Sequence, residues 1–375
     1  RDGSFSPRPF RELICLAASL VLAALASRSV HAASVVVIGD SLSAEYETIP
    51  DFPGTENPTE YARITVEGWE SMCWVEVLAR LRPNHFNFGG FRSDLPGWPD
   101  LRFTGYEFNF AIPGFRAAQY EDIVHSSFFS NPQYLLFQST LRETLKNQAD
   151  AVVIWLGANE FRANFGFLAD GGASAPLINN LTNDLHAVVE FVQKQRPNLK
   201  IVLANIPDLG AAPDKRASHP DPAKRALVTA ATQQANAAIT ALAAAKGVAV
   251  ANVYSQTERL IQGVTTYFGA VDVIDEVHPD NHPRYHFTRD GLHPNTASQL
   301  EIARAVIDAF NSADQAAIPN ITDSEALKFL RLRPDQPYLD WIETSVVAGK
   351  KMEDDPDGDG LPNLVEFALA LDPGT

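Results

Sequence analysis

The chain has 375 residues, of which 45% are hydrophobic and 20% are charged, with 22 glycines and 25 prolines. This composition is typical of a folded, enzyme-sized protein and argues against a disordered or collagen-like chain. The formal net charge of −16 argues against a protein that binds nucleic acid by neutralising phosphates or that binds an anionic membrane surface.

The N-terminus has the pattern of a secretory signal. Three arginines within the first eleven residues precede an uncharged apolar run from Leu13 to Ala26, and a small residue, Ala32, follows at a suitable cleavage position. The run is shorter than the roughly 20 residues that span a bilayer comfortably. We expect residues 1–32 to be removed, and the protein to be secreted, periplasmic or at the cell surface without a stable membrane span. A retained N-terminal anchor is the alternative.

After this signal, short β-branched segments alternate with longer helical ones, which is typical of a parallel sheet covered by helices on both faces. The expected strands are Ser34–Ile38, Tyr106–Ala111, Ala151–Leu156, Lys200–Asn205 and Val248–Val253. The expected helices are Pro132–Gln148, Ala175–Arg196, Asp221–Lys246 and Asn295–Phe310. Residues 33–310 therefore predict one α/β domain with a doubly wound, flavodoxin-like parallel sheet, whose ligands bind at the carboxyl ends of the strands.

Two segments depart from this alternation. Residues 45–105 form an insertion rich in proline, glycine and aromatic residues, which predicts either a wall of a substrate site or a satellite core beneath a loop. Beyond Phe310 we expect a linker at residues 311–323 and a small helical module at residues 324–375, where the composition becomes acidic.

Only Cys73 would remain in the mature chain, because Cys15 lies in the expected signal. An intramolecular disulfide is then impossible. Apolar residues follow Cys73 at helical spacing as far as Leu81, and Pro83 comes next, so we expect Cys73 to pack in a helix rather than to act as a nucleophile.

A serine, Ser41, directly follows the first expected strand, at the edge of the sheet where ligands bind. A serine hydroxyl is a weak nucleophile that needs a base, and a third group must orient that base. Asp290 and His293 lie three residues apart in the turn before the last helix, so one loop can supply both groups. Ser41 alone would suggest a helix N-cap, but the combination predicts nucleophilic catalysis.

Two further groups follow other expected strands and are suited to stabilise an oxyanion. Gly114 allows close approach of the backbone and offers an N–H group, and Asn159 offers a side-chain amide.

These four blocks, in the order Ser, Gly, Asn and His, resemble those of the SGNH (GDSL) hydrolase family. The resemblance implies that Ser41 is the nucleophile, that Asp290 and His293 are the acid and base, and that the backbone of Ser41 and Gly114 forms the oxyanion hole with the Asn159 side chain. It implies no cofactor for catalysis. Residues 205–210 are similar to a stretch that lines the edge of the pocket in family members. The chain departs from many relatives at Glu160, where they have Asp.

Two other patterns concern metal ions. His278, His282 and His286 recur every four residues, but intervening prolines break any helix that would align them, so we expect a loop beside the active site rather than a zinc site.

The stretch from Asp355 to Glu366 resembles thrombospondin type 3 and dockerin-like calcium loops. Its oxygen donors are spaced as a calcium loop requires, and two glycines permit the sharp turn. The expected ligands are Asp355, Asp357, Asp359, the Leu361 carbonyl, Asn363 and Glu366. We expect structural Ca²⁺ here, and a solvated acidic tail is the alternative.

The sequence therefore predicts an exported serine ester hydrolase, like a carboxylesterase or lipase, that cleaves acyl esters through an acyl-enzyme. The expected substrate is an ester of a small molecule, a lipid or an acylated glycan. One alternative is a carbohydrate O-deacetylase with the same triad, since the aromatic insertion is suited to stack on sugars. The other is a calcium-bearing binding protein without catalytic activity.

Overall fold

The computed structural model describes residues 32–46, 71–92, 99–102, 105–127, 131–314, 317–345 and 350–371. The expected signal lies outside these ranges apart from Ala32, and so does a large part of the 45–105 insertion. Among the described residues, none of the helices has both the length and the apolar character that crossing a membrane requires.

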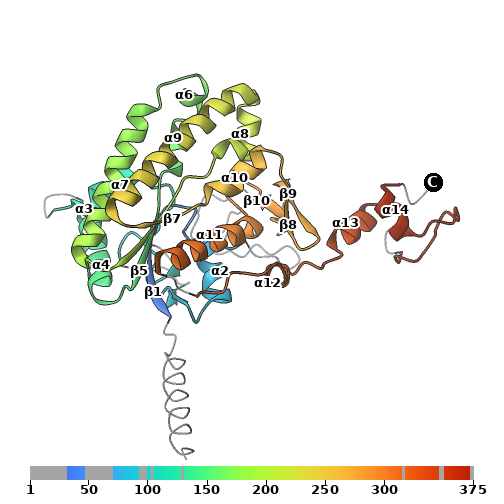
Figure 1. Ribbon diagram of the computed structural model, residues 1–375, viewed down its shortest axis with the longest axis horizontal. Helices are drawn as coiled ribbons and strands as arrows, with labels where there is room; N and C mark the ends of the chain where they lie inside the picture. The colour runs from blue at the N-terminus through green and yellow to red at the C-terminus, as the bar shows by residue number, and fades with distance from the viewer. Residues whose placement is uncertain are drawn as a thin grey trace, which may run out of the picture.

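A five-stranded sheet forms the centre of the molecule, and all of its strand pairings are parallel (Figure 1). In spatial order its strands are β2 (Phe86–Asn87), β1 (Ala33–Gly39), β5 (Ala151–Trp155), β6 (Lys200–Ala204) and β7 (Ala249–Ala251). Counted along the chain, these strands have the order 2-1-3-4-5, which is the flavodoxin-like order. The predicted fold class is thus confirmed.

Successive side chains of a strand point to opposite faces of the sheet, so the apolar strands have two apolar faces. Helices cover both of these faces. Val36 and Ile38 of β1 pack in a core with helices α3, α4, α7 and α9, whereas Val35 and Val37 pack in a second core with α2 and α11. Figure 1 shows the two layers. The bounds of these helices are α2 Trp74–Leu81, α3 Ala117–Val124, α4 Pro132–Asn147, α7 Ala175–Gln195, α9 Pro222–Lys246 and α11 Thr296–Asp314.

The four long helices that the sequence predicts are confirmed by α4, α7, α9 and α11, with differences of up to four residues at their ends. The helix expected to contain Cys73 is α2, but it begins one residue later, so Cys73 is its N-cap and is buried. Remaining short helices are α5 Ala158–Ala163, α6 Phe165–Ala169, α8 Pro213–Ser218, α10 Tyr254–Ile261, α12 Asp323–Phe329, α13 Gln336–Thr344 and α14 Asn363–Leu369, with a 3₁₀ turn at Leu209–Ala211.

The predicted strand Tyr106–Ala111 is wrong as a regular strand. Only Gly105–Tyr106 is a strand, β4, and it pairs antiparallel with β3 (Phe91–Arg92) outside the central sheet. The chain then runs beside β1, where Phe110 N–H donates to the Val37 carbonyl at 2.8 Å, but it makes only an isolated bridge at Asn109. The Asn109 side chain accepts a hydrogen bond from Ala111 N–H at 3.1 Å, and such local bonds compete with a regular ladder.

A second sheet, which the sequence analysis did not predict, lies between α10 and α11 in the chain. It consists of β8 (Thr266–Phe268), β9 (Val271–Val277) and β10 (Tyr285–Phe287), with β9 in the middle. The last of these strands leads directly into the loop that carries Asp290 and His293. This sheet therefore supports one side of the candidate site.

Residues 318–332 pack on the α/β domain, so the expected boundary, a linker at 311–323 before a module at 324–375, lies too early. Ile321, Ala326, Leu327, Leu330 and Leu332 all belong to the core that contains α2 and α11. The composition of residues 311–320 suggested a linker, but the apolar residues after it match a buried helical face. A separate small cluster forms only later, where Tyr338 and Ile342 of α13 pack with neighbours that include Phe367 of α14.

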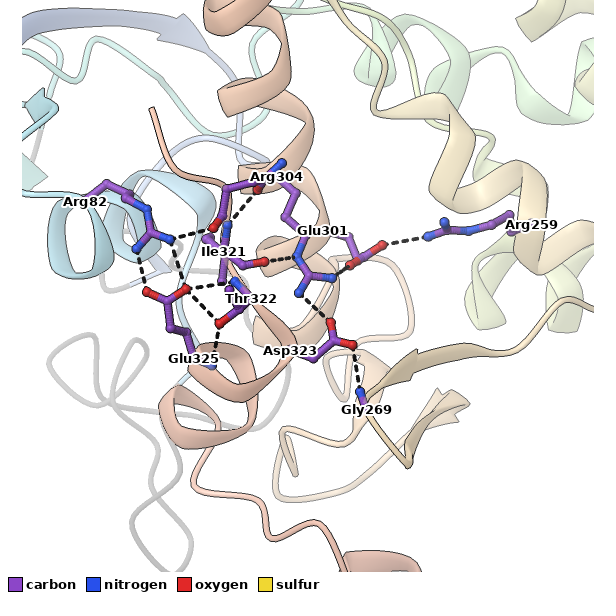
Figure 2. A network of polar contacts seen from close by, with 10 residues as sticks. Arg82, Arg259, Gly269, Glu301, Arg304, Ile321, Thr322, Asp323 and Glu325 are labelled. Carbon is purple, nitrogen blue, oxygen red and sulfur yellow. Dashed lines mark hydrogen bonds and ion pairs between the residues drawn. The ribbon is translucent and has the colours of Figure 1, made fainter. Parts of the chain in front are cut away.

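Two arginines attach this segment to the domain (Figure 2). Arg82, which follows α2, pairs with Glu325 at 2.9 Å and donates to the carbonyls of residues 319 and 320 at 2.7 and 2.8 Å. Arg304 of α11 pairs with Asp323 at 2.8 Å and donates to the Ile321 carbonyl at 2.9 Å. Both contacts lie at the N-terminus of α12, so they hold its first turn against α2 and α11.

Candidate active site

Ser41 lies in the tight turn that follows β1. The Asp40 carbonyl accepts hydrogen bonds from the N–H groups of Ser43 and Ala44, both at 3.0 Å, and its side chain accepts from Leu42 N–H at 2.9 Å. A Cβ at Gly39 would lie 2.9 Å from the Ser43 Cβ, so the turn requires glycine there. The turn thus presents Ser41 at the carboxyl end of the sheet, as predicted.

The structure brings Ser41, His293 and Asp290 together. The Ser41 hydroxyl lies 2.8 Å from His293 Nε2, and His293 Nδ1 is hydrogen-bonded to Asp290 Oδ2. The other oxygen, Asp290 Oδ1, accepts from the Thr288 hydroxyl at 2.7 Å and from the N–H groups of Leu292 and His293 at 2.9 and 3.0 Å. One loop therefore orients the imidazole through both oxygens of the carboxylate.

The charge state of Asp290 follows from these contacts. Burial alone would raise its pKa, but attraction to His293 and the hydrogen bonds it accepts outweigh burial and lower the pKa to about 2. The carboxylate is therefore ionised at neutral pH and accepts the Nδ1 proton, which leaves Nε2 with a lone pair toward Ser41. Such an arrangement can remove the serine proton and stabilise the resulting imidazolium.

Asn159 lies in the first turn of α5, directly after β5. Its amide donates to the Phe115 carbonyl at 2.9 Å and to Asp40 Oδ2 at 3.2 Å, so it contacts the turn that holds Ser41. Gly157 precedes it with a φ of +119°, and a Cβ there would lie 2.7 Å from Ile206. Gly114 has a φ of +80°, and a Cβ there would meet open space, as a backbone donor beside a ligand would need.

Two buried carboxyl groups beside the site were missed as functional residues by the sequence analysis. Asp40 is 1% exposed and binds Asn159, and burial raises its pKa to about 7. Glu160 is a buried residue of α5 that accepts from the N–H group of Ala117, the first residue of α3, and burial also raises its pKa. Their positions next to Ser41 and Asn159 in the chain could have drawn attention to both carboxyl groups. The sequence alone did not show which groups they contact.

The ligand atoms of the three histidines in the loop before the site do not gather into one group. Within the described ranges, Asp355, Asp357 and Asp359 are the only group of three or more His, Cys, Asp or Glu whose ligand atoms gather. His286 Nδ1 lies 2.8 Å from the Ser298 hydroxyl, and His282 Nδ1 accepts from Arg284 N–H at 3.1 Å. The loop does border the site, because the His282 carbonyl accepts from the Asn295 side chain at 2.9 Å.

The C-terminal acidic loop is compact. Carboxylate oxygens of Asp355, Asp357 and Asp359 lie within 4.8 Å of one another, and the two oxygens of Asp355 accept from the N–H groups of Gly358 and Gly360. Asn363 and Glu366 are buried at the start of α14, and Asn363 Oδ1 has no hydrogen-bond partner among the described residues. Carboxylate and amide oxygens are the ligands that Ca²⁺ prefers, so the residues present fit this ion.

A small apolar cavity of about 40 Å³ lies against residues that flank the candidate site. Leu42 follows Ser41 in the chain, and Leu292 and Pro294 lie on either side of His293. Residues 207–209, within the stretch compared above with a pocket edge, also line the cavity.

Comparison with known proteins identifies the family of the chain. The family model described as GDSL-like Lipase/Acylhydrolase matches residues 35–306, which include every residue of the candidate site. Among curated proteins, no relative matches the chain.

Several solved structures are similar to the chain. Phospholipase A1 from Streptomyces albidoflavus NA297 is 15% identical, with 75% of this chain and 99% of that chain covered and a TM-score of 0.40. An extracellular lipase from Streptomyces rimosus is 17% identical, with 75% and 100% covered and a TM-score of 0.41. A family 3 carbohydrate esterase from Clostridium thermocellum is 16% identical, with 77% and 100% covered and a TM-score of 0.39. Because the family model spans most of the chain, the chain belongs to the GDSL-like lipase/acylhydrolase family and is an ester-cleaving hydrolase.

Proposed function

We propose that this protein is an exported serine esterase in which Ser41 is the nucleophile and His293 is the general base. The observation that carries this proposal is the hydrogen-bonded series from Ser41 through His293 to Asp290, with 2.8 Å between Ser41 Oγ and His293 Nε2. Export is supported by the secretory pattern of the first 32 residues.

In this mechanism His293 Nε2 takes the hydroxyl proton as Ser41 Oγ attacks the ester carbonyl. The N–H groups of Ser41 and Gly114 and the Asn159 amide donate to the oxyanion that develops. His293 then gives its proton to the leaving alcohol, and the acyl-enzyme forms. A water molecule, deprotonated by His293, attacks the acyl-enzyme and releases the acid and Ser41.

The proposed substrates are acyl esters of small molecules, lipids or glycans. The cavity beside Leu42 supports an acyl group on this side of the site, because its wall is formed largely by apolar side chains. A carbohydrate O-deacetylase with the same triad is the second candidate, because the aromatic residues of the 45–105 insertion are suited to stack on sugars. A binding protein without activity is disfavoured, since such a role needs no base within 2.8 Å of Ser41.

The test is hydrolysis of p-nitrophenyl esters of increasing acyl length and of acetylated xylan, together with labelling by an organophosphonate. We expect labelling at Ser41 and loss of several orders of magnitude in turnover in Ser41→Ala, because the triad acts as a unit. Labelling elsewhere, or full turnover in Ser41→Ala, would overturn the mechanism. Release of acetate from xylan faster than hydrolysis of every simple ester would select the deacetylase.

We also propose a structural Ca²⁺ ion in the C-terminal loop, held by Asp355, Asp357, Asp359, the Leu361 carbonyl, Asn363 and Glu366. The gathered carboxylates and the buried, unpartnered Asn363 Oδ1 support this proposal. The ion would neutralise the mutual repulsion of the carboxylates and would have no part in ester cleavage.

A further inference from the structure

Tyr46 is a fully buried residue five positions after Ser41, and the mechanism above gives it no role. Its ring lies edge-to-face with the His293 imidazole, with 6.3 Å between ring centroids and an interplanar angle of 77°. An aromatic ring in this arrangement limits the orientations open to the imidazole and keeps water from that side of it.

Among the described residues, two hydrogen-bond partners of the Tyr46 phenol lie in the segment that follows His293. Its hydroxyl donates to the carbonyl of Pro294, the residue directly after His293. It also accepts from Gln299 Nε2 at 2.8 Å, and Gln299 is a fully buried residue of α11. Burial raises the pKa of Tyr46 well above its usual value, so the phenol keeps the proton that it donates.

The same hydrogen-bonded network returns to the turn of Ser41. Gln299 Oε1 accepts from Trp74 N–H at 3.0 Å, and the Trp74 indole donates to the Ser43 hydroxyl at 3.1 Å. The backbone carbonyl of Ser43 in turn accepts from the Asn109 side chain at 2.9 Å. All side chains of this network are buried, and buried networks with satisfied partners hold their groups in one arrangement.

We infer that Tyr46, together with Gln299, is a positioning residue that holds His293 in register with Ser41. The two reacting groups come from opposite ends of the chain, and no covalent connection shorter than the whole domain sets their separation. Tyr46 belongs to the serine side of the site, and its phenol binds the segment of the histidine. This inference rests on the proposed roles of Ser41 and His293.

Only a phenol can fill this place. Phenylalanine would keep the ring but would remove the donor to the Pro294 carbonyl, and Gln299 Nε2 would keep only its longer contact of 3.5 Å to the Leu42 carbonyl. The peptide that follows His293 would then lose its anchor. A displacement of catalytic groups by about 1 Å can cost about 10²-fold in rate. The loss should fall on the chemical step, because Tyr46 is fully buried and is not available to bind substrate.

The experiment compares Tyr46→Phe with Tyr254→Phe in the full-length protein. Tyr254 is a matched control, because it is also buried and its hydroxyl also accepts from a glutamine, Gln233 Nε2, at 3.0 Å. For Tyr46→Phe we expect kcat to fall about 10- to 100-fold with KM within about twofold, and the organophosphonate to label Ser41 more slowly by a similar factor. Tyr254→Phe should keep kcat, KM and the labelling rate.

A second variant, Gln299→Met, tests the connection itself. It should lower kcat at constant KM, and the double variant should lose less than the sum of the two single losses in activation free energy, because both changes break one linkage. If Tyr46→Phe does not fold by circular dichroism, Gln299→Met alone decides. Full additivity, or a loss that falls on KM, would overturn the inference.

Measurements on the wild-type protein distinguish a failure of the proposed function from a failure of the positioning role of Tyr46. If the wild type neither hydrolyses esters nor reacts with the organophosphonate, the proposed function fails. If the wild type is active and Tyr46→Phe matches Tyr254→Phe in kcat and labelling rate, only the positioning role of Tyr46 fails.

Discussion

The amide of Asn159 already has two acceptors, the Phe115 carbonyl at 2.9 Å and Asp40 Oδ2 at 3.2 Å. An oxyanion on the substrate would compete with Asp40 for the longer of these bonds. The hydrogen bond to Phe115 would then keep the amide aimed at the site. The Asn159 amide can thus donate to Asp40, in the turn of Ser41, before the reaction and to the oxyanion during it.

Asn159→Ala should therefore lower kcat by about 10²- to 10³-fold, which is typical of one lost oxyanion donor. A suitable control is Asn164→Ala, because the Asn164 amide donates to the Glu160 carbonyl at 2.8 Å, near α5 but away from Ser41. Steady-state kinetics on a p-nitrophenyl ester gives kcat and KM for both variants. A rise in KM at constant kcat would instead make Asn159 a substrate contact.

The two aspartates of the site should affect stability in opposite directions as pH changes. Burial raises the pKa of Asp40 to about 7 in the folded state, against an unfolded value of about 4. The folded protein then binds the extra proton between these values, so the stabilisation is complete below about pH 4 and is lost as pH rises through about 7. Asp290 has a folded pKa of about 2, so its contribution is present above about pH 4 and is lost toward pH 2.

Melting temperature measured against pH tests this pair. Asp40→Asn should flatten the fall between about pH 4 and 7, and Asp290→Asn should flatten the fall below about pH 4. An unchanged profile in Asp40→Asn would mean that the carboxyl at position 40 is not held protonated by its surroundings.

Ser41, Asp290 and His293 could be predicted from the sequence because each lies in a short turn at the end of a buried element. Their types and spacing also limit their chemistry. Tyr46 and Asp40 could not be assigned in this way, since their roles depend on contacts with Pro294 and Asn159, which lie far away in the chain. The role of a buried polar side chain can be inferred only when its hydrogen-bond partner is known.

At the scale of elements, the sequence predicted well where one pattern dominates. The strands β1 and β5 are continuous apolar runs, and the long helices have caps such as Asp221, which accepts from Ala223 N–H at 2.9 Å. The small sheet was missed because β8 and β10 have only three residues each and the pairing of β10 with β9 is irregular. Local propensity is weak in such segments, and tertiary contacts decide the structure.

The helix α12 leads to a prediction about where the chain can be shortened. Ile321, Leu327 and Leu330 are buried in the core with α2 and α11, and burial of each such side chain contributes about 1.5–3 kcal/mol. A chain that ends at Phe310 should therefore melt at a much lower temperature and lose esterase activity. A chain that ends at residue 334 should keep both, because Arg284 then still pairs with Asp272.

Thermal melting and an ester assay on the two shortened chains provide the measurement. Equal stability of both would show that the burial of α12 contributes little, and that residues 311–332, which extend beyond the predicted linker at 311–323, are dispensable. A chain ending at residue 334 that is inactive would instead show that α13 is needed, through the ion pair of its Asp340 with Arg284.

In the molecule as a whole, the α/β domain and the segment of α13 and α14 differ in the size of their apolar cores. The α/β domain is held by two large apolar cores on either side of the sheet. The cluster of α13 and α14 is small, with Tyr338 and Ile342 as its buried members among the described residues. A core of that size stabilises little, so the acidic loop beside it is the place where an ion would matter most.

Calcium should therefore stabilise the C-terminal segment and leave catalysis unchanged. If the ion binds only the folded loop, a hundredfold excess over Kd adds about 2.7 kcal/mol to the stability of that segment. Limited proteolysis should then cut within residues 350–366 faster in EDTA than in calcium, while ester hydrolysis proceeds equally in both, because the serine mechanism uses no metal. Glu366→Gln should remove the calcium effect, whereas the matched change Glu353→Gln, just outside the loop, should keep it.

If EDTA abolished hydrolysis, the metal-free mechanism would be wrong. If neither proteolysis nor melting responded to calcium, residues 355–366 would be a solvated acidic tail, and their gathered carboxylates would bind no ion.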